Sequence, residues 1–424
     1  MEQEQADQLK TQSEENNGKI KGYLVHAGLF ILTLITTTLA GAEWSFQRML
    51  FYTDPAMSWE DFLGGFSFSF PFLLALTVHE FGHYFTAKYY QVRVTLPYYI
   101  PVWFGFIGMP SIGTMGAFIR IKDAITSRKI FFDIGIAGPL AGFVVAIGVL
   151  FYGFTHLPAP DEIFDIHPEY LAFGEDYQDY VYSADTIIYK EDLQFLDQET
   201  LSQLEDSIVF DSSRPQIKLG NNLLFIFFTN YVADDPEMVP NPYEIYHFPW
   251  LLAGYLILLF TAINLIPVGQ LDGGHVLYGL IGYKKHRTAS AVIFIAFVFY
   301  TGLGLVNPHL FNEQVTWGIP NFIIEIGFYL FFLYYTFYSL SPDKKTRWIV
   351  SLSVLASQLL LLYFFPTLKG SSGWLLFAFL IGRFLGVYHP PALFDQPLDL
   401  KRQVLGWIAL IIFVISFSPS IFVS

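Results

Sequence analysis

The chain has 424 residues, of which 53% are apolar and only 14% are charged, and its mean hydropathy is +0.44. About a quarter of the residues in a soluble domain are charged, and 45 phenylalanines exceed what a soluble surface tolerates, so the composition predicts a polytopic membrane protein. The net charge of −14 argues against a nucleic-acid partner, and the absence of cysteine excludes disulfides, thiol catalysis and cysteine-ligated zinc.

Residues 1–21 are polar and rich in Gln, Glu and Asn, and we expect them to form a disordered cytoplasmic tail. Beyond them, charge-poor apolar runs recur that approach the roughly 20 residues needed to cross a bilayer. They predict an all-α fold with eight to nine transmembrane helices, at residues 22–41, 66–90, 131–153, 248–266, 288–306, 318–340, 347–365, 372–388 and 404–422. The run at 372–388 is the weakest prediction of a transmembrane helix. If it is re-entrant and does not cross, the C-terminus lies on the opposite side of the membrane.

The second predicted span, in the first membrane segment (residues 22–153), contains the sequence HEFGH with His79, Glu80 and His83. On a helix, positions i and i+4 share a face, so both imidazoles can reach one Zn²⁺ while Glu80 contacts a metal-bound water. No charged residue occurs between Phe62 and Val78. Since a carboxylate flanked by two histidines is expensive inside a spanning helix, the motif predicts a functional metal site rather than a polar cluster between helices.

The connection at residues 154–247 differs from the others in charge. It holds 19 acidic and 3 basic residues, whereas the rest of the chain sums to +2. We expect a solvated, acidic, extracytoplasmic segment, with a substrate gate as the alternative.

A broken helix is expected at residues 248–286. The apolar run that begins at Phe248 meets Asp272 within NLIPVGQLDGGHV, where Pro267 removes a backbone donor and several glycines allow the chain to turn. Irregular backbone at membrane depth is tolerated where it is buried or lines a watery cavity. This places Asp272 where a third metal ligand is needed, with His275 as the rival ligand.

The distribution of Lys and Arg predicts the orientation, because cytoplasmic loops retain these residues. With the N-terminus in the cytoplasm, 18 of the 23 basic residues lie inside and 5 lie outside. Residues 287–424 are then accessory transmembrane helices without a recognisable motif.

HEFGH in a membrane helix, followed almost 190 residues later by NLIPVGQLDGG, resembles the site-2 protease family of intramembrane zinc metalloproteases. The stretches GTMGAFIRIKDAITSRKIFFD and IGIAGPLAG also look like that family, and the resemblance covers residues 66–285. It implies proteolysis of a membrane-anchored substrate in or beside its transmembrane helix.

The resemblance also implies roles for individual residues. His79, His83 and Asp272 are zinc ligands and Glu80 is the general base. Asn264 matches a family position that holds the substrate backbone or the developing oxyanion, with an interhelical hydrogen bond as the alternative.

Residues 94–121 are too interrupted by proline and glycine to span. Family members place membrane-embedded strands there, with Gly113 and Gly116 in turns that help to position an unwound substrate. The family's PDZ-like insert is not apparent.

Two other classes remain open. A membrane HExxH protease of another type would use a downstream Glu as its third ligand, and Glu325 is the intramembrane candidate. A non-enzymatic metal transporter predicts inverted repeats, which the sequence does not reveal. The sequence does not select the substrate, and a bacterial inner membrane is expected, with archaeal or plastid membranes as alternatives.

Overall fold

The computed structural model describes residues 2–53, 55–182, 187–189, 208–211, 218–310, 315–316 and 319–423. The chain is mostly helical and divides into two compact units. Unit 1 comprises Met1–Asp123, Val144–Gln216 and Val232–Ile257, and unit 2 comprises Ala124–Phe143, Ile217–Tyr231 and Leu258–Ser424. Two helices, α4 (Arg128–Thr155) and α9 (Pro249–Leu265), contribute to both units.

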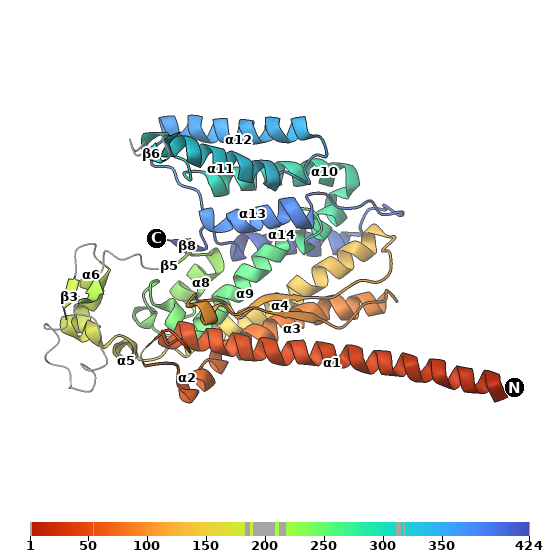
Figure 1. Cartoon of the computed structure of the whole chain (residues 1–424), viewed down its shortest axis with the longest axis horizontal. Helices are drawn as coiled ribbons and strands as arrows, with labels where there is room; N and C mark the ends of the chain where they lie inside the picture. Colours follow the sequence, from red (N-terminus) through yellow and green to blue (C-terminus); the bar gives the residue numbers. More distant parts are fainter. Residues whose placement is uncertain are drawn as a thin grey trace. The chain divides into compact units, whose positions relative to one another are not determined.

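Unit 1 begins with the long helix α1 (Glu2–Phe46), drawn in red in Figure 1. Its residues Ile20–Phe46 are long and apolar enough to cross a membrane. We predicted disorder for residues 1–21, but the described residues of that stretch continue α1 without a break. The physical reason is that Glu, Gln and Lys, which make the stretch polar, are also strong helix formers.

Helices α2 (Trp59–Gly64) and α3 (Phe66–Tyr89) follow, and Ser58 and Asp61 form a capping box at the start of α2. Small side chains let α1 and α3 approach closely: a Cβ on Gly41 would lie 2.5 Å from the carbonyl oxygen of Gly65. The hydroxyls of Thr37 and Ser69 are 2.6 Å apart. These contacts fix α3 along α1.

An antiparallel hairpin of β1 (Tyr98–Pro101) and β2 (Thr114–Phe118) comes next, with the 3₁₀ helix η1 (Gly105–Ile107) between its strands. The strands expected in 94–121 are therefore present. Near the base of the hairpin, Arg93 donates hydrogen bonds to both carboxylate oxygens of Asp123 and thereby lowers the pKa of that carboxyl.

The rest of unit 1 includes much of the acidic segment. Its short helices surround a small core of Ile163, Tyr170, Tyr177 and Val181. The described elements are η2 (Pro160–Glu162), α5 (Ile163–Ile166), η3 (Pro168–Asp176), α6 (Tyr177–Val181), the antiparallel strands β3 (Ile187–Tyr189) and β4 (Ile208–Asp211), η5 (Pro236–Met238) and η6 (Ile245–His247). Several residues of the acidic segment between 183 and 217 lie outside the described part of the chain.

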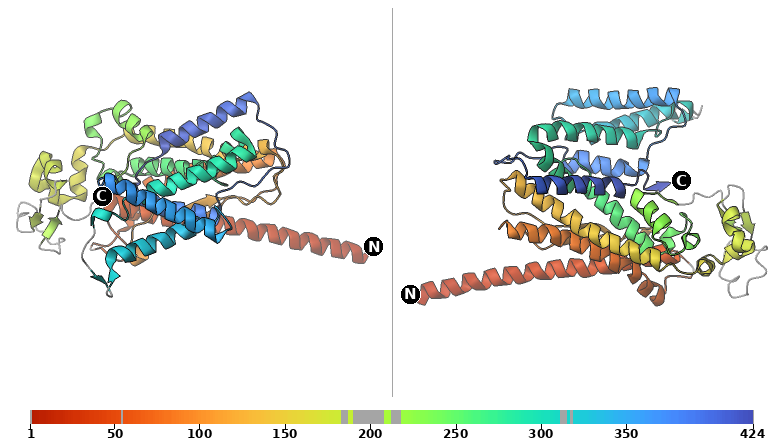
Figure 2. Two further views of the ribbon diagram at one scale, coloured as in Figure 1. Left: turned by 90° about the horizontal axis from the view of Figure 1, so that it is seen from above. Right: turned by 180° about the vertical axis from the view of Figure 1, so that it is seen from behind.

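Unit 2 contains one helix of the acidic segment and the C-terminal helices. They are α8 (Leu223–Tyr231), α10 (Asp272–Gly302), η7 (Pro308–Leu310), α11 (Asn321–Thr336), α12 (Lys344–Phe364), η8 (Ser372–Trp374), α13 (Leu375–Leu380), the π-helix η9 (Ile381–Leu385) and α14 (Leu400–Ser416). Two short antiparallel pairs join β5 (Lys218–Leu219) to β8 (Phe422–Val423) and β6 (Val315–Thr316) to β7 (Ile319–Pro320). Figures 1 and 2 show α11 and α12 side by side.

One core cluster of unit 2 includes Phe294, Leu333 and Phe337, each fully buried. Inside α10, Gly282 is left-handed and interrupts the helix. The carbonyl of Gly279, three residues before Gly282, accepts two hydrogen bonds from the guanidinium of Arg128, at 3.0 and 2.8 Å. Arg128 therefore satisfies a backbone group next to the interruption.

The structure supports a membrane protein. Among the described residues, four helices are long and apolar enough to cross a membrane: Ile20–Phe46, Trp59–Tyr89, Arg128–Thr155 and Lys344–Phe364. Three more are apolar but shorter: Pro249–Leu265, Asn321–Thr336 and Ser372–Leu385. The predicted total of eight to nine transmembrane helices is thus not confirmed.

Gly113→Ala should destabilise the hairpin. Gly113 has a left-handed φ of 83°, and a Cβ there would lie 2.4 Å from Cα of Thr37. Gly108 is a matched control, because its φ of 73° is equally unfavourable for alanine while a Cβ would meet only the Tyr52 ring at 3.4 Å. We expect Gly108→Ala to lose about 1–2 kcal/mol from the left-handed backbone and Gly113→Ala to lose more, measured by thermal unfolding in detergent. Equal losses would contradict the close approach of α1.

Candidate metal centre

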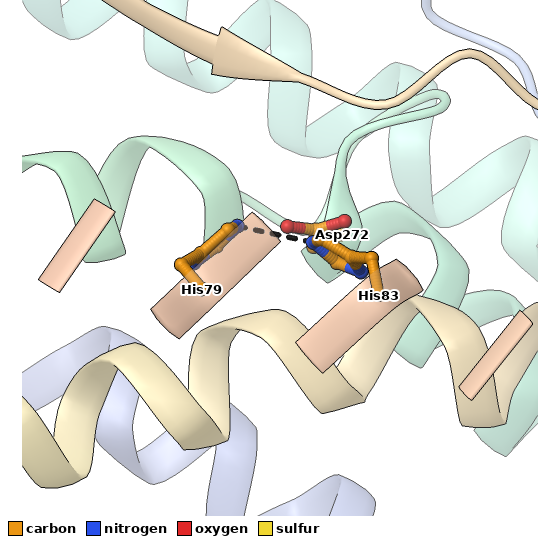
Figure 3. Close-up of side chains that lie close together, drawn as sticks. All are labelled: His79, His83 and Asp272. Carbon is orange, nitrogen blue, oxygen red and sulfur yellow. Dashed lines mark hydrogen bonds between the residues drawn. The ribbon is translucent and has the colours of Figure 1, made fainter. Parts of the chain in front are cut away.

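Three residues of the HEFGH motif are buried in α3: His79, Glu80 and His83 are 6%, 5% and 7% exposed. The Nε2 atoms of the two histidines are 3.0 Å apart, as the dashed line in Figure 3 marks. With Zn–N bonds of about 2.0–2.1 Å, two ligand atoms of a tetrahedral zinc site lie roughly 3.3 Å apart. The pair on α3 therefore has the spacing that a shared metal ion requires, and the predicted i, i+4 geometry is present.

The hairpin holds this stretch of α3 in place. The hydroxyl oxygens of Thr77, two residues before the motif, and Tyr99 on β1 are 2.8 Å apart. Tyr99 is buried and packs edge-on against Phe30 of α1, and the ring of His26 contacts the carbonyl oxygen of Pro97 through Nδ1 at 3.0 Å. The hairpin is thus anchored to both α1 and α3 beside the buried motif.

Asp272 lies in the first turn of α10 and is partly buried. Helix α9 ends at Leu265, and residues 266–271 form the turn before α10, so the predicted broken helix is present. Figure 3 labels Asp272 at this helix start. A carboxylate in the first turn interacts favourably with the N-terminal end of the helix dipole.

Glycines make the turn before Asp272 this tight. Gly269 is left-handed, with a φ of 62°, and its N–H donates to Oγ of Ser290. A Cβ on Gly273 would lie 2.0 Å from the carbonyl oxygen of Leu265, and one on Gly274 would lie 2.3 Å from that of Gly269. Both helix ends are therefore held together at backbone contact distance.

The two rival ligands have other surroundings. His275 stacks on Phe131, and its Nδ1 lies 2.7 Å from Nε2 of His389, all within unit 2. Glu325 is exposed on α11 and belongs to none of the groups of three potential ligands found among the described residues.

The remaining predicted site residues have the following positions. Asn264 is partly buried in the last turn of α9. Gly116 is left-handed within β2, with a φ of 104°, and its N–H donates to Oγ1 of Thr114. The carbonyl of Gly113 accepts hydrogen bonds from Oγ1 of Thr36 at 2.7 Å and from the N–H of Val102. Packing against α1 thus accounts for Gly113, while substrate positioning by either glycine stays a prediction.

Sequence reasoning missed one cluster. His167, Glu244 and His247 are all buried and form a second group with metal-ligand chemistry. The only local signal was the i, i+3 spacing of Glu244 and His247, which is common in helices.

A buried HExxH sequence within an apolar, membrane-length helix is the pattern typical of a membrane-embedded metallopeptidase. The profile of "Peptidase family M50" matches residues 67–304, which is more than half of the chain. The chain belongs to this family, and the predicted resemblance to site-2 proteases is confirmed.

Curated relatives are plant proteins. The chain is 26% identical over 271 residues to "Probable zinc metalloprotease EGY2, chloroplastic" of Oryza sativa subsp. indica, covering 60% of this chain and 39% of that protein. It is 25% identical over 290 residues to "Probable zinc metalloprotease EGY1, chloroplastic" of Arabidopsis thaliana, covering 64% and 42%. The chain thus spans about two fifths of the length of these relatives. No solved structure matches it significantly.

These names bear on localisation. The structure and the family support a membrane protein, whereas relatives named as chloroplastic give no support to the bacterial inner membrane expected from the sequence.

Gly273→Ala should disrupt the turn that carries Asp272, because the new methyl group would meet the backbone of Leu265. Overpacking of this kind costs about 1–3 kcal/mol. Gly327→Ala is the control: Gly327 is also helical, but a Cβ there has nothing within 4 Å. Thermal unfolding in detergent should show a lower Tm for Gly273→Ala and an unchanged or higher one for Gly327→Ala. A Gly273→Ala protein as stable as the wild type would show that the turn relaxes without loss.

Proposed function

We propose that this protein is an intramembrane zinc metalloprotease that hydrolyses a peptide bond in or beside the transmembrane helix of a membrane-anchored substrate. The observation that carries the proposal is the pair of buried imidazoles on α3, with their Nε2 atoms 3.0 Å apart and Glu80 buried between them in sequence. Membership of peptidase family M50 and the names of the relatives support the same activity.

His79, His83 and Asp272 hold the zinc ion in this proposal. Two neutral imidazoles and a carboxylate are a ligand set of catalytic zinc sites, which keep one position open for water. Because the chain has no cysteine, nitrogen and oxygen donors are the ones it can offer. Bound zinc supplies a Lewis acid that polarises the scissile carbonyl and makes water acidic near neutral pH.

The protein's own groups perform the proton transfers. Glu80 accepts the proton of the attacking water and then delivers it to the leaving amine. Asn264 is assigned the role of holding the substrate backbone or the developing negative charge on its carbonyl oxygen. Its position one residue before the end of α9, close in sequence to the turn that leads to Asp272, supports this assignment.

Substrate binding is assigned to the hairpin. A helical substrate must unwind, because its carbonyls are otherwise hydrogen-bonded, and an extended segment can then pair with a strand edge. The two-stranded sheet of β1 and β2 has such edges and is anchored beside the motif through Tyr99. Gly116 lets another backbone come close to β2.

The topology completes the proposal. The chain crosses the bilayer eight or nine times with its N-terminus in the cytoplasm. The 18-to-5 distribution of basic residues supports this, and each of the nine predicted spans overlaps a helix of the structure. The acidic segment then lies on the extracytoplasmic side.

Glu80→Gln should abolish cleavage and leave zinc bound, because glutamine keeps the shape of the side chain but cannot accept the proton. We expect a loss of about 10²–10⁴-fold in the cleavage rate. Metal analysis of the purified protein and comparison of membrane proteomes, with an uncleaved stub accumulating in the variant, measure the two effects. Unchanged proteolysis would rule out a protease that works through Glu80.

Asp272→Asn tests the third ligand and keeps a polar side chain at the start of α10. We expect the variant to lose most of its zinc and its cleavage activity. Glu325→Gln is the matched control, since it removes the charge of an exposed carboxylate on α11. The opposite pattern, with zinc lost in Glu325→Gln and kept in Asp272→Asn, would favour an HExxH protease of the other type.

A further inference from the structure

A second group of potential ligands lies in unit 1 and shares no residue with the motif of α3. His167 follows α5, Glu244 directly precedes η6, and His247 is the last residue of η6. The three are 9%, 2% and 4% exposed, and each offers one ligand atom within 4.8 Å of the others.

The separations match a shared ion. The Nε2 atoms of His167 and His247 are 3.1 Å apart, and Oε2 of Glu244 lies 3.3 Å from Nε2 of His247 and 3.8 Å from that of His167. Ligand atoms around a tetrahedral zinc ion lie roughly 3.3 Å apart. The spacing therefore resembles that of the histidine pair on α3.

The outer nitrogens of both rings have acceptors. Nδ1 of His247 lies 3.0 Å from the backbone carbonyl oxygen of Ser45, which can only accept, so this nitrogen carries the hydrogen. Nδ1 of His167 lies 2.9 Å from Oε1 of Glu169 and donates to it likewise. With both hydrogens on Nδ1, the two Nε2 atoms face each other at 3.1 Å and are free to act as metal ligands. Metal-bound histidines typically donate their other N–H to a carboxylate or a backbone carbonyl.

The carboxylate of Glu244 is oriented in the same way. Its Oε1 accepts hydrogen bonds from the hydroxyls of Tyr170 and Tyr182. Its Oε2 is buried, accepts no further hydrogen bond from the described residues and is the oxygen that faces the two histidines.

The side-chain amide of Gln47 lies against the same two rings. Its Nε2 lies 3.3 and 3.2 Å from the Nε2 atoms of His167 and His247. Rotation of the amide by 180° places its carbonyl oxygen there instead. Gln47 has a left-handed φ of 52°, which a glutamine rarely adopts. Beside the cluster, a cavity of about 430 Å³ is lined by His247 and by the exposed acidic residues Glu162 and Asp165, which favour a cation.

We propose that His167, Glu244 and His247, with Gln47 or a water as the fourth ligand, form a structural site for Zn²⁺ at the extracytoplasmic end of unit 1. Closed tetrahedral sites of this kind hold chain segments together. The ion would connect Gln47, which follows α1, to His167, which follows α5, and to His247 in η6. It would thereby attach the acidic segment to the start of α9.

Metal stoichiometry tests this site separately from the α3 site. We expect about two zinc ions per chain in the wild type and about one in His79→Ala/His83→Ala. His167→Ala/His247→Ala should also keep about one, and the combined quadruple variant none. Adding His156→Ala to the α3 variant is the control, because His156 is an exposed histidine of the same segment. Zinc-free His79→Ala/His83→Ala protein would overturn the second site. If instead only the second site binds zinc, the wild type holds one ion, and His79→Ala/His83→Ala keeps it.

A second measurement covers the case in which the histidine variants fail to fold. In folded His79→Ala/His83→Ala protein, a chelator should raise the rate of proteolysis within residues 157–182 several-fold, and added Zn²⁺ but not Mg²⁺ should restore protection. Co²⁺ in place of Zn²⁺ should give the visible absorption of a tetrahedral site. If the two rings merely share a proton, neither zinc nor chelator changes the cleavage rate and no such absorption appears, which would overturn the proposal.

Discussion

The low polarity of the bilayer is the constraint on which the rest of this structure depends. A polar backbone group or a charge without a partner costs about 2–4 kcal/mol of free energy there. Helices are therefore interrupted only where other groups replace the lost backbone hydrogen bonds. The turn between α9 and α10 illustrates this, because Ser290 accepts from the N–H of Gly269 and donates to the carbonyl of Val387. Near the left-handed Gly282, Arg128 has the same role for the carbonyl of Gly279.

The same constraint gives the polar residues of α3 their meaning. A helix of mostly apolar side chains that buries His79, Glu80 and His83 together must compensate for their desolvation. A metal ion would compensate for it, since it would bind the imidazole nitrogens and attract the carboxylate. The polar residues that are unfavourable in a membrane helix without a metal are therefore the ones that the proposed zinc site requires.

Features encoded over short distances could be predicted from the sequence. The i, i+4 spacing of His79 and His83 requires only that the segment be helical, and the proline and glycines around Asp272 specify a break. Each predicted span likewise overlaps a helix, because apolar runs of this length carry their own signal. The number of crossings was harder, since α11 and the α13 region are shorter than their apolar runs suggested. The polar start of α1 was predicted wrongly, because composition alone does not separate a disordered tail from a helix of Glu, Gln and Lys.

Features that depend on contacts between distant residues could not be predicted. His167 and His247 are 80 residues apart in the chain, and Gln47 is 120 residues from His167, so no local pattern joins them. Gly113 appeared to be a turn residue, and its second constraint, the backbone of α1, lies more than 70 residues earlier. The acidic segment was expected to be solvated because of its charge, yet Glu244 within it is almost fully buried among tyrosines and histidines. Net charge describes the surface of such a segment, and only the fold reveals which of its carboxylates has been withdrawn from water.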